Sequence, residues 1–502
     1  MGIDQIFELA REAHEKMNAG DLGDALDIAY RIRNLGEHYY VSYIVSGLLI
    51  NIGNVQANEQ IVREGFELLR KDFETIVRHK ELVPSAHYNL ANGYSALSHF
   101  RKMKNPLAAC FKETELDQAK GHYRKALEYE PQDTEFLVNL GNCYDEFGRV
   151  VDALECYDEA LRCKPDHGMA LGNKGLALSY YALVAGEHER TFLLEAYSLL
   201  SEALRLGVLP ESVSSFSKRL EEIREQFPDK SILDNPPEFP GCKIGAESRF
   251  EKFLSEFCFK NKLYLNTCNL CQKCDAAIGD TAAIRRMVVP RKQGERYPSA
   301  IMHLLSYLNQ IKQDYVSARF LLVLSRYSEL NLDFVDKRVK IIDTLDHSLH
   351  NIRIQLAKTS FKNFYDILDK IACFINDYLG LGISEKRTYF HTLWYPKNSK
   401  TVRKRIEQTN NFTLNALFGM NKDFGKNGHC EKLRNTRNAL THRFVNIRSF
   451  QEKEDDRNMT EETLIKQTLD LGKLVRNAII YLLYFVDVEE RKRIQVGKQA
   501  ST

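Results

Sequence analysis

The strongest constraint on the fold is a regular alternation of small and large residues between Thr134 and His167. In order along the chain, its members are Leu137, Leu140, Gly141, Tyr144, Gly148, Ala153, Tyr157, Ala160 and Pro165. Small residues let two antiparallel helices approach closely, and the larger residues fill the space between them. Because proline cannot continue a helix, Pro165 predicts where the second helix ends. The segment is therefore predicted to fold as a helical hairpin.

The same pattern recurs on both sides of this segment. The upstream copy consists of His87, Leu90, Ala91, Tyr94, Ala119, Tyr123, Ala126 and Pro131, and the downstream copy of Leu171, Gly175, Leu178, Ala196, Leu200 and Ala203. Two degenerate pairs precede these, around Ala13 and Ala25 and around Gly47 and Gly65. The complete copy resembles a tetratricopeptide repeat (TPR) of about 34 residues. This resemblance implies an all-α superhelical array over residues 1–207, and generic helical hairpins are the alternative.

Arrays of this type form a concave surface from the first helix of each pair, and that surface usually binds a peptide or protein. Asn92 and Asn142 recur at the same repeat position on this surface, and Asp145 follows one turn after Asn142. We expect these three residues to contact a protein or peptide ligand. The alternative is that their side chains are simply solvated.

Residues 208–244 have a different composition, because five prolines surround one charged helix predicted near Ser217–Gln226. The prolines are Pro210, Pro228, Pro236, Pro237 and Pro240. Such a segment predicts a linker. A chain of 502 residues also exceeds the length that one hydrophobic core usually serves. We therefore expect an array at 1–207, a helical domain at 245–490 and a basic tail at 491–502.

Four cysteines follow this linker, and the last three have C-x-x-C-x-x-C spacing. They are Cys258, Cys268, Cys271 and Cys274. Structural zinc sites usually join two C-x-x-C pairs across a longer loop, so this group is a weak metal candidate and free thiols are favoured. No cofactor is expected, because the sequence contains no glycine-rich nucleotide-binding motif and no nucleophile elbow.

From Tyr297 onward, apolar residues recur at helical spacing in three stripes, which predict the core faces of a helical bundle. The stripes are Ile301, Leu304, Leu308, Ile311, Tyr315, Ala318 and Leu322; Phe364, Leu368, Ile371, Ile375 and Tyr378; and Leu464, Leu471, Val475, Ile479 and Leu482. A fourth helical segment carries the hexapeptide Arg437-Asn438-Ala439-Leu440-Thr441-His442.

This hexapeptide combines a fixed cation, an amide and an imidazole, a set that suits cleavage of a phosphodiester. Arginine binds phosphate through paired N–H groups, and histidine exchanges protons near neutral pH. On an ideal helix Arg437 lies about a third of a turn from His442. Both therefore reach one groove only if their side chains converge or a second protomer contributes. A helix-capping and salt-bridging surface is the alternative interpretation.

The R-N-x-x-x-H pattern resembles the signature of HEPN-domain ribonucleases, which are all-helical RNA-cutting domains common in prokaryotic toxin and phage-defence systems. Segments 263–266 and 308–319 are similar to one HEPN subfamily that is fused to TPR repeats. The resemblance implies that Arg437, Asn438 and His442 are catalytic, that no metal is needed, and that the domain forms a homodimer.

Two carboxylates, Asp366 and Asp369, stand on the polar side of the second stripe, and either could orient His442.

Charge is concentrated between Lys397 and Arg443, where basic residues outnumber carboxylates. Such a cluster attracts phosphate, and salt screens the attraction. Within it, the residues predicted to bind RNA are Arg403, Lys404, Arg405, Arg434 and Arg443. A solvated basic face is the alternative. Four aromatic residues just upstream, Tyr389, Phe390, Trp394 and Tyr395, either stack on bases or pack in the core.

The net charge of +2 neither requires nor excludes a nucleic-acid partner. No signal-peptide pattern and no apolar run of membrane-spanning length occurs, so a cytoplasmic location without membrane association is expected. The favoured function is a metal-independent endoribonuclease that the repeat array regulates as a sensor, in a toxin or antiviral defence system. Two alternatives stay open. One is a TPR scaffold whose bundle only dimerises, and the other is a regulatory bundle that binds a nucleotide.

Overall fold

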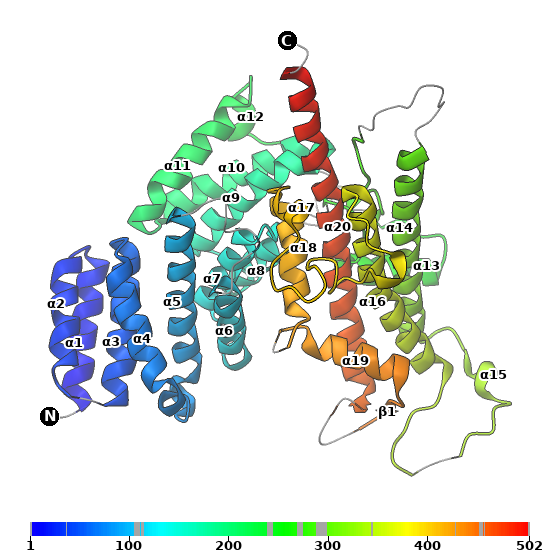
Figure 1. The fold of residues 1–502 in the computed structure, drawn as a ribbon, viewed down its shortest axis with the longest axis horizontal. Coiled ribbons are helices and arrows are strands. Elements are labelled where there is room, and N and C mark those ends of the chain that lie inside the picture. The colour runs from blue at the N-terminus through cyan, green and yellow to red at the C-terminus, as the bar shows by residue number, and fades with distance from the viewer. Residues whose placement is uncertain are drawn as a thin grey trace. The chain divides into compact units, whose positions relative to one another are not determined.

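The computed structural model describes residues 3–36, 38–104, 111, 115–237, 244–268, 275–287, 299–342, 345–426, 428–450, 455 and 457–499. Contacts divide the chain into two compact units, one of Met1–Leu183 with Glu189–Pro236 and the other of Val184–His188 with Pro237–Thr502. Apart from two three-residue strands, the regular elements of the described residues are helices (Figure 1), which confirms the expected all-α class.

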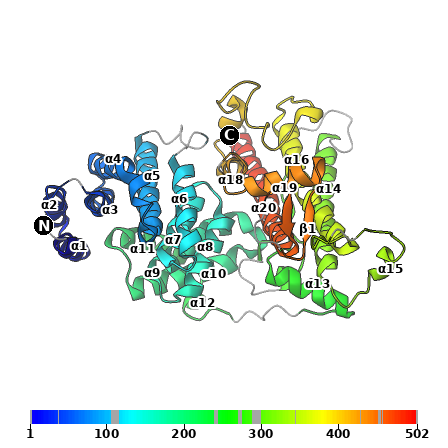
Figure 2. The same cartoon turned by 90° about the horizontal axis from the view of Figure 1, so that it is seen from below.

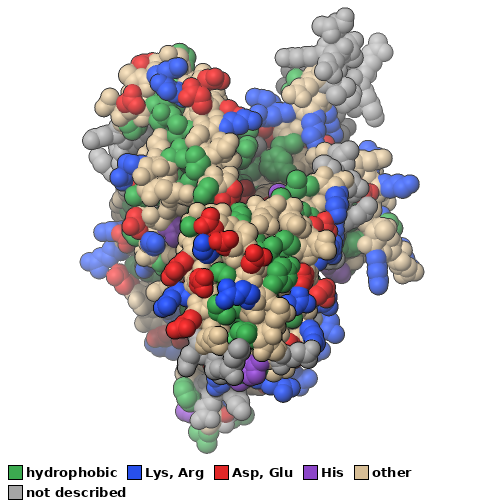
Figure 3. All heavy atoms as spheres, turned by 90° about the vertical axis from the view of Figure 1, so that its left-hand side faces the viewer, with side chains coloured by type: hydrophobic (Ala, Val, Ile, Leu, Met, Phe, Trp, Pro, Cys, Tyr) green, Lys and Arg blue, Asp and Glu red, His purple; other side chains and the backbone are tan. Residues whose placement is uncertain are grey.

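The first unit is a series of helices in which neighbours in sequence pack together. They are α1 (Ile3–Asn18), α2 (Leu22–Arg33), α3 (Tyr39–Val55), α4 (Glu59–Ile76), α5 (Val83–Lys104), α6 (Glu115–Tyr129), α7 (Thr134–Glu146), α8 (Val150–Cys163), α9 (Gly168–Ala185), α10 (Glu189–Leu206), α11 (Pro210–Glu225) and α12 (Ser231–Asp234). The side of the molecule with α1 and α2 carries interspersed basic and acidic side chains (Figure 3), as expected for a solvated surface.

The hairpin of α7 and α8 forms for the reason that its sequence predicts. Asp133 caps α7 by accepting a hydrogen bond from the Phe136 backbone N–H at 2.9 Å. A Cβ atom added at Gly141 would lie 2.5 Å from Cε1 of Tyr157, so only glycine permits this closeness. The second helix ends at Cys163, two residues before Pro165.

Two other hairpins of the array also have a glycine where their two helices approach closely. A Cβ atom at Gly65 in α4 would lie 2.8 Å from Cβ of Leu49 in α3, and one at Gly175 in α9 would lie 2.8 Å from Cγ of Leu200 in α10. Ala13 and Ala25 are fully buried between α1 and α2. The predicted pairs on both sides of the complete repeat are therefore present as packed helices.

Helix α11 lies within the segment predicted as a linker, yet it packs on the array. Its Phe216 and Ile223 are buried, and Nε of Arg219 donates to Oγ of Ser179 in α9 at 2.7 Å. Residues 210–225 of the predicted linker therefore belong to the packing of the first unit.

The second unit is built on three long helices, α14 (Ser299–Arg326), α16 (Ile352–Leu379) and α20 (Glu461–Gln499), which pack on one another (Figure 2). Around them lie α13 (Arg249–Lys260), α15 (Asp333–Asp336), α17 (Lys404–Glu407), α18 (Phe412–Asp423) and α19 (Glu431–His442). The predicted apolar stripes supply the core, since Ile311, Tyr315, Phe364, Ile371 and Leu471 are fully buried.

Two buried arginines bind the segment Leu263–Asn266 to this core. Arg476 of α20 donates from Nε to the Tyr264 carbonyl at 2.9 Å and from Nη2 to the Asn266 carbonyl at 3.0 Å. Arg319 of α14 donates to the Leu263 carbonyl at 3.1 Å and pairs with Asp280 at 2.7 Å. The two segments that carry the subfamily resemblance therefore contact each other, and the contact is structural.

After α19 the chain enters β1 (Asn446–Arg448), which pairs in parallel with β2 (Asn458–Thr460). Asn446 donates from Nδ2 to Asp346 at 3.0 Å, and the Leu349 N–H donates to the Ile447 carbonyl at 2.6 Å. These bonds fix the backbone just beyond His442. As far as the structure describes them, none of the helices combines the length and apolarity needed to cross a bilayer.

Candidate functional site

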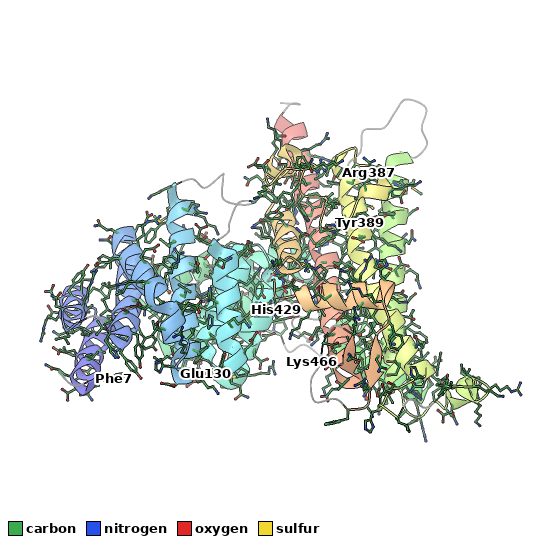
Figure 4. All side chains as sticks on the ribbon, turned by 60° about the horizontal axis from the view of Figure 1, so that its bottom comes forward. Phe7, Glu130, Arg387, Tyr389, His429 and Lys466 are labelled. Carbon is green, nitrogen blue, oxygen red and sulfur yellow. The ribbon has the colours of Figure 1, made fainter. Side chains whose placement is uncertain are left out.

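The second unit contains a pocket of about 980 Å³ between α16, α18, α19 and the segment 389–395. Its lining combines aromatic, amide, basic and acidic side chains, namely Tyr365, Leu368, Asp369, Tyr389, Phe390, His391, Thr392, Tyr395, Asn421, Lys422, Phe424, Gly425, Arg434, Arg437, Asn438 and His442. Figure 4 labels Tyr389, on the segment that follows α16, and His429, just before α19. A concave site with this mixture suits a polar ligand with aromatic parts.

Helix α19 brings the three predicted catalytic residues to this pocket. Its buried face consists of Leu433, Thr436 and Ala439, which dock the helix on the bundle. Arg437, Asn438 and His442 all line the pocket, and His442 is the exposed last residue of the helix. The guanidinium and the imidazole therefore line one pocket within a single chain, which is one of the two arrangements that the helical spacing permitted.

The Arg437 guanidinium lies over the Tyr365 ring, with Cζ 5.3 Å from the ring centroid. Its Nη1 donates a long bond to Oδ1 of Asn438 at 3.4 Å, and Nη2 lies 3.9 Å from Oδ1 of Asp366. Nε is buried and has no hydrogen-bond partner in the part of the chain that the structure describes. The Nη contacts are long, so the Nη N–H groups of this pocket-lining side chain can bind an anion, whereas Nε is enclosed.

Two carboxylates accompany Arg437 in the pocket region. Asp369 accepts a hydrogen bond from the Phe390 backbone N–H at 2.8 Å, and burial raises the pKa of its carboxyl although Arg437 opposes the shift. Burial also raises the pKa of Asp366, again against Arg437. Burial and the Asp369 charge raise the pKa of the neighbouring Tyr365 hydroxyl to about 12. A carboxylate with a raised pKa is better matched to proton transfer near neutral pH.

The five residues predicted to bind RNA are placed in different ways. Arg434 lines the pocket, where it donates to the Phe424 carbonyl at 2.7 Å and to Glu431 at 2.8 Å. Nε of Arg403 donates to the Leu393 carbonyl at 2.8 Å, so this cation holds its own loop. The exposed Lys404, Arg405 and Arg443 are not part of the described pocket lining.

The aromatic residues divide between pocket and core. Tyr389, Phe390 and Tyr395 line the pocket, whereas Trp394 is fully buried and packs edge-on against Phe390 and Phe418. Asp369 was predicted from the sequence and Lys422 belongs to the predicted basic stretch, whereas Tyr365, His391 and Asn421 were not predicted. The available signal for His391 was its place beside the predicted aromatic group.

The cysteine group is described only in part. Cys258 and Cys268 are buried, and burial raises the pKa of the Cys258 thiol to about 12. Cys271 and Cys274 lie outside the described residues. Among the described side chains there is no cluster of three or more potential metal ligands. The zinc interpretation stays a prediction.

In the first unit, the two predicted groove asparagines take part in a hydrogen-bonded row across the repeats. Oδ1 of Asn92 accepts from the Tyr123 hydroxyl at 2.6 Å, and Oδ1 of Asn142 accepts from the Tyr157 hydroxyl at 2.8 Å. Asp145 is half-buried, and burial with the nearby Glu146 raises the pKa of its carboxyl to about 6. A role for the three residues in ligand binding stays a prediction.

Comparison with known proteins identifies both parts of the chain. Residues 297–489 match the family model described as LA2681-like HEPN, and residues 111–171 match a tetratricopeptide repeat model. The protein thus carries an LA2681-like HEPN domain at its carboxy-terminal end, with TPR repeats before it, which confirms the resemblance inferred from the sequence. A HEPN domain is typically a ribonuclease and implies an RNA substrate, and TPR repeats imply protein binding.

Solved structures with some likeness include TTC0263, a thermophilic TPR protein in Thermus thermophilus, at 16% identity and a TM-score of 0.33 over 43% of this chain and 98% of that one. Another is the TPR2AB-domain:pHSP90 complex of yeast Sti1, at 12% identity and a TM-score of 0.17 over 44% of this chain and 99% of that one. No curated protein matches the chain.

Proposed function

We propose that this protein is an endoribonuclease that cleaves RNA without a metal ion. The proposed site is the pocket lined by Arg437, Asn438 and His442 of α19, called the α19 pocket below. The observation that carries the proposal is the meeting of Arg437, Asn438 and His442 in one pocket of a HEPN domain. The pocket unites a cation for phosphate with a group that can move a proton.

The proposed reaction is attack of the ribose 2′-oxygen on the adjacent phosphorus, with breakage of the bond from phosphorus to the 5′-oxygen. Arg437 stabilises the negative charge that builds on the phosphate, because the contacts of its Nη atoms are long and leave these N–H groups available to an anion. His442 acts as general acid or base, and Asn438 orients it or the phosphate. The products carry a 2′,3′-cyclic phosphate on one fragment and a 5′-hydroxyl on the other, and attack of water on the cyclic phosphate, with breakage of the bond from phosphorus to the 2′-oxygen, gives a 3′-phosphate end.

Two proton transfers are needed, one from the 2′-hydroxyl and one to the 5′-oxygen. Asp369 is the second titratable group that we assign to this chemistry, since it lines the same pocket and burial raises the pKa of its carboxyl. Asp369 takes the proton from the 2′-hydroxyl, and the protonated His442 supplies the one that the 5′-oxygen requires.

The test is cleavage of RNA in the presence of a chelator, followed by sequencing of the ends. We expect His442→Ala and Arg437→Ala each to lower the rate by about 100-fold or more. Lys432→Ala is the matched control, because Lys432 is exposed on the same helix and lies outside the pocket lining. If both pocket variants cut RNA as fast as the parent, the proposal is wrong.

We further propose that the TPR array senses a protein partner and restrains the nuclease, that the protein acts in a toxin or antiviral defence system, and that the HEPN domain dimerises. The array supports the first part because repeat grooves bind proteins. Toxicity on expression should be relieved by His442→Ala and altered by Asp145→Lys in the full chain. Unchanged toxicity in the Asp145 variant would contradict its predicted role in the groove.

A nucleotide-binding regulator is the second candidate, and the pocket volume of about 980 Å³ favours it, because this volume is also enough for a single nucleotide. Tight binding of ATP or a cyclic nucleotide by a protein that cuts no RNA would favour the second candidate over the first. A scaffold without either activity would show neither RNA turnover nor nucleotide binding.

A further inference from the structure

The α19 pocket contains a polar side chain that the proposed reaction does not use. Asn421 lies in the last turn of α18, lines the pocket and is only 8% exposed. Its Oδ1 has no hydrogen-bond partner among the described residues. Because burial of an unpaired amide is unfavourable, native proteins usually satisfy such a group with a protein, water or ligand partner.

Flat aromatic surface lies in the same pocket. Tyr389 is 43% exposed, and its ring stacks on His391 with centroids 5.8 Å apart and an interplanar angle of 22°. Tyr395 adds a third ring from the same segment. Exposed rings of this kind stack on nucleobases, and the stacking tolerates any base.

Basic side chains line the same pocket. Lys422 follows Asn421 in α18 and also lines the pocket, with Nζ 4.9 Å from the centroid of the Phe418 ring. Arg434 and Arg437 enter the pocket from α19. The pocket lining therefore offers cations to a phosphate, and rings and an amide to an adjoining base.

We propose that Asn421, Tyr389 and His391 form a base subsite, which takes one unpaired nucleobase of single-stranded RNA beside the phosphate at Arg437. The rings supply stacking, and the Asn421 amide, with one acceptor and two donors, selects among bases by the pattern on their edge. The substrate is single-stranded, because bases in an RNA helix are not available for stacking on side chains. This inference rests on the proposed ribonuclease function.

The test is the base composition around the cut sites in a pool of random-sequence RNA. We expect the parent to prefer one base next to the cut, and Asn421→Leu to reduce that preference about tenfold to 100-fold. Asn421→Asp keeps the acceptors but loses the donors, so it should change which base is preferred. Tyr389→Ala should slow cutting at all sequences alike, because stacking is sequence-tolerant.

Asn415→Ala is the matched control, because Asn415 is a similarly buried amide on the same helix and lies outside the described pocket lining. It should leave the base preference unchanged. If Asn421→Leu cuts with the parent's preference, the base subsite is wrong while the ribonuclease proposal stands. A more stable Asn421→Leu protein with unchanged preference would show that the amide serves only an ordered water.

A binding measurement separates the two proposals. Titration of the full-length His442→Ala protein with the four nucleoside 3′-monophosphates needs no cleavage. Unequal affinities that Asn421→Leu makes equal would support the subsite even if the parent cuts no RNA. Equal affinities in both proteins, together with no base preference in cutting, would overturn it.

Discussion

At the scale of single residues, the burial of Asp369 affects both its proposed role in proton transfer and the stability of the protein. Burial raises the pKa of its carboxyl, so the charged form is disfavoured in the folded protein. The stability that the neutral form provides is present below the unfolded-state pKa and is lost as the pH rises through the higher folded-state pKa. At neutral pH the folded protein therefore bears the cost of a partly buried charge.

Asp369→Asn should therefore be more stable than the parent at pH 7 and gain little at low pH. Its Oδ1 can still accept the bond from the Phe390 N–H. The same change should lower RNA cleavage by about 100-fold or more and remove the acid limb of the pH profile. Denaturant unfolding at two pH values and cleavage rates across pH measure both effects.

The control for that variant is Asp470→Asn in α20. Partial desolvation also raises the pKa of Asp470, which is not among the described residues that line the pocket. Cleavage by this variant should match the parent. If Asp369→Asn retains full activity, Asp369 has no role in proton transfer.

Asp366 offers a second residue-scale prediction, on binding. Its Oδ1 lies 3.9 Å from Nη2 of Arg437, and its side chain is 58% exposed. Asp366→Asn removes a negative charge beside the phosphate-binding cation, so RNA affinity should rise about two- to fivefold at low salt. The gain should shrink as salt is added. Equal affinities of parent and variant at low salt would mean that Asp366 does not compete with phosphate for Arg437.

The sequence predicts some residues of the candidate site and not others. Arg437, Asn438 and His442 lie within six positions on one helix, so local spacing was enough to find them. Asn421 and Tyr365 carry no such signal, because they enter the pocket from α18 and α16 and their convergence depends on how those helices pack. Arg403 was predicted to bind RNA from charge alone, but its Nε donates to a backbone carbonyl.

At the scale of helices, Gly141 shows why the repeat could be predicted from the sequence. The close approach of α7 and α8 requires a residue without a side chain, and that requirement appears directly as a glycine at a fixed spacing. The packing of α11 on the array could not be predicted in this way, because the spacing of Val213, Phe216, Leu220 and Ile223 indicates an apolar helix face but not which surface covers it. Long-range contacts of this type leave little local pattern.

Gly141→Ala should destabilise the protein by about 1–3 kcal/mol, because the new Cβ would lie 2.5 Å from the Tyr157 ring. Gly121→Ala in α6 is the matched control, since a Cβ there meets nothing within 4 Å. Alanine has the higher helix propensity, so that variant should gain about 0.5–1 kcal/mol. Denaturant unfolding compares the two, and equal stabilities would contradict the packing argument.

At the scale of the whole molecule, the arrangement of the pocket predicts how a dimer would behave. Arg437 and His442 line one pocket of one chain. A mixture of Arg437→Ala and His442→Ala proteins should therefore stay inactive, because a mixed dimer contains no pocket with both residues. Recovery of about a quarter or more of the parental activity after mixing and subunit exchange would mean that two chains share each site.

The binding of Leu263–Asn266 by Arg319 and Arg476 has a practical consequence for truncation. The HEPN family match begins at residue 297, downstream of that segment and of Asp280. A fragment expressed from residue 297 would leave two interior guanidinium groups without their carbonyl and carboxylate partners, at a cost of several kcal/mol. A minimal fragment of the second unit must therefore start upstream of Leu263.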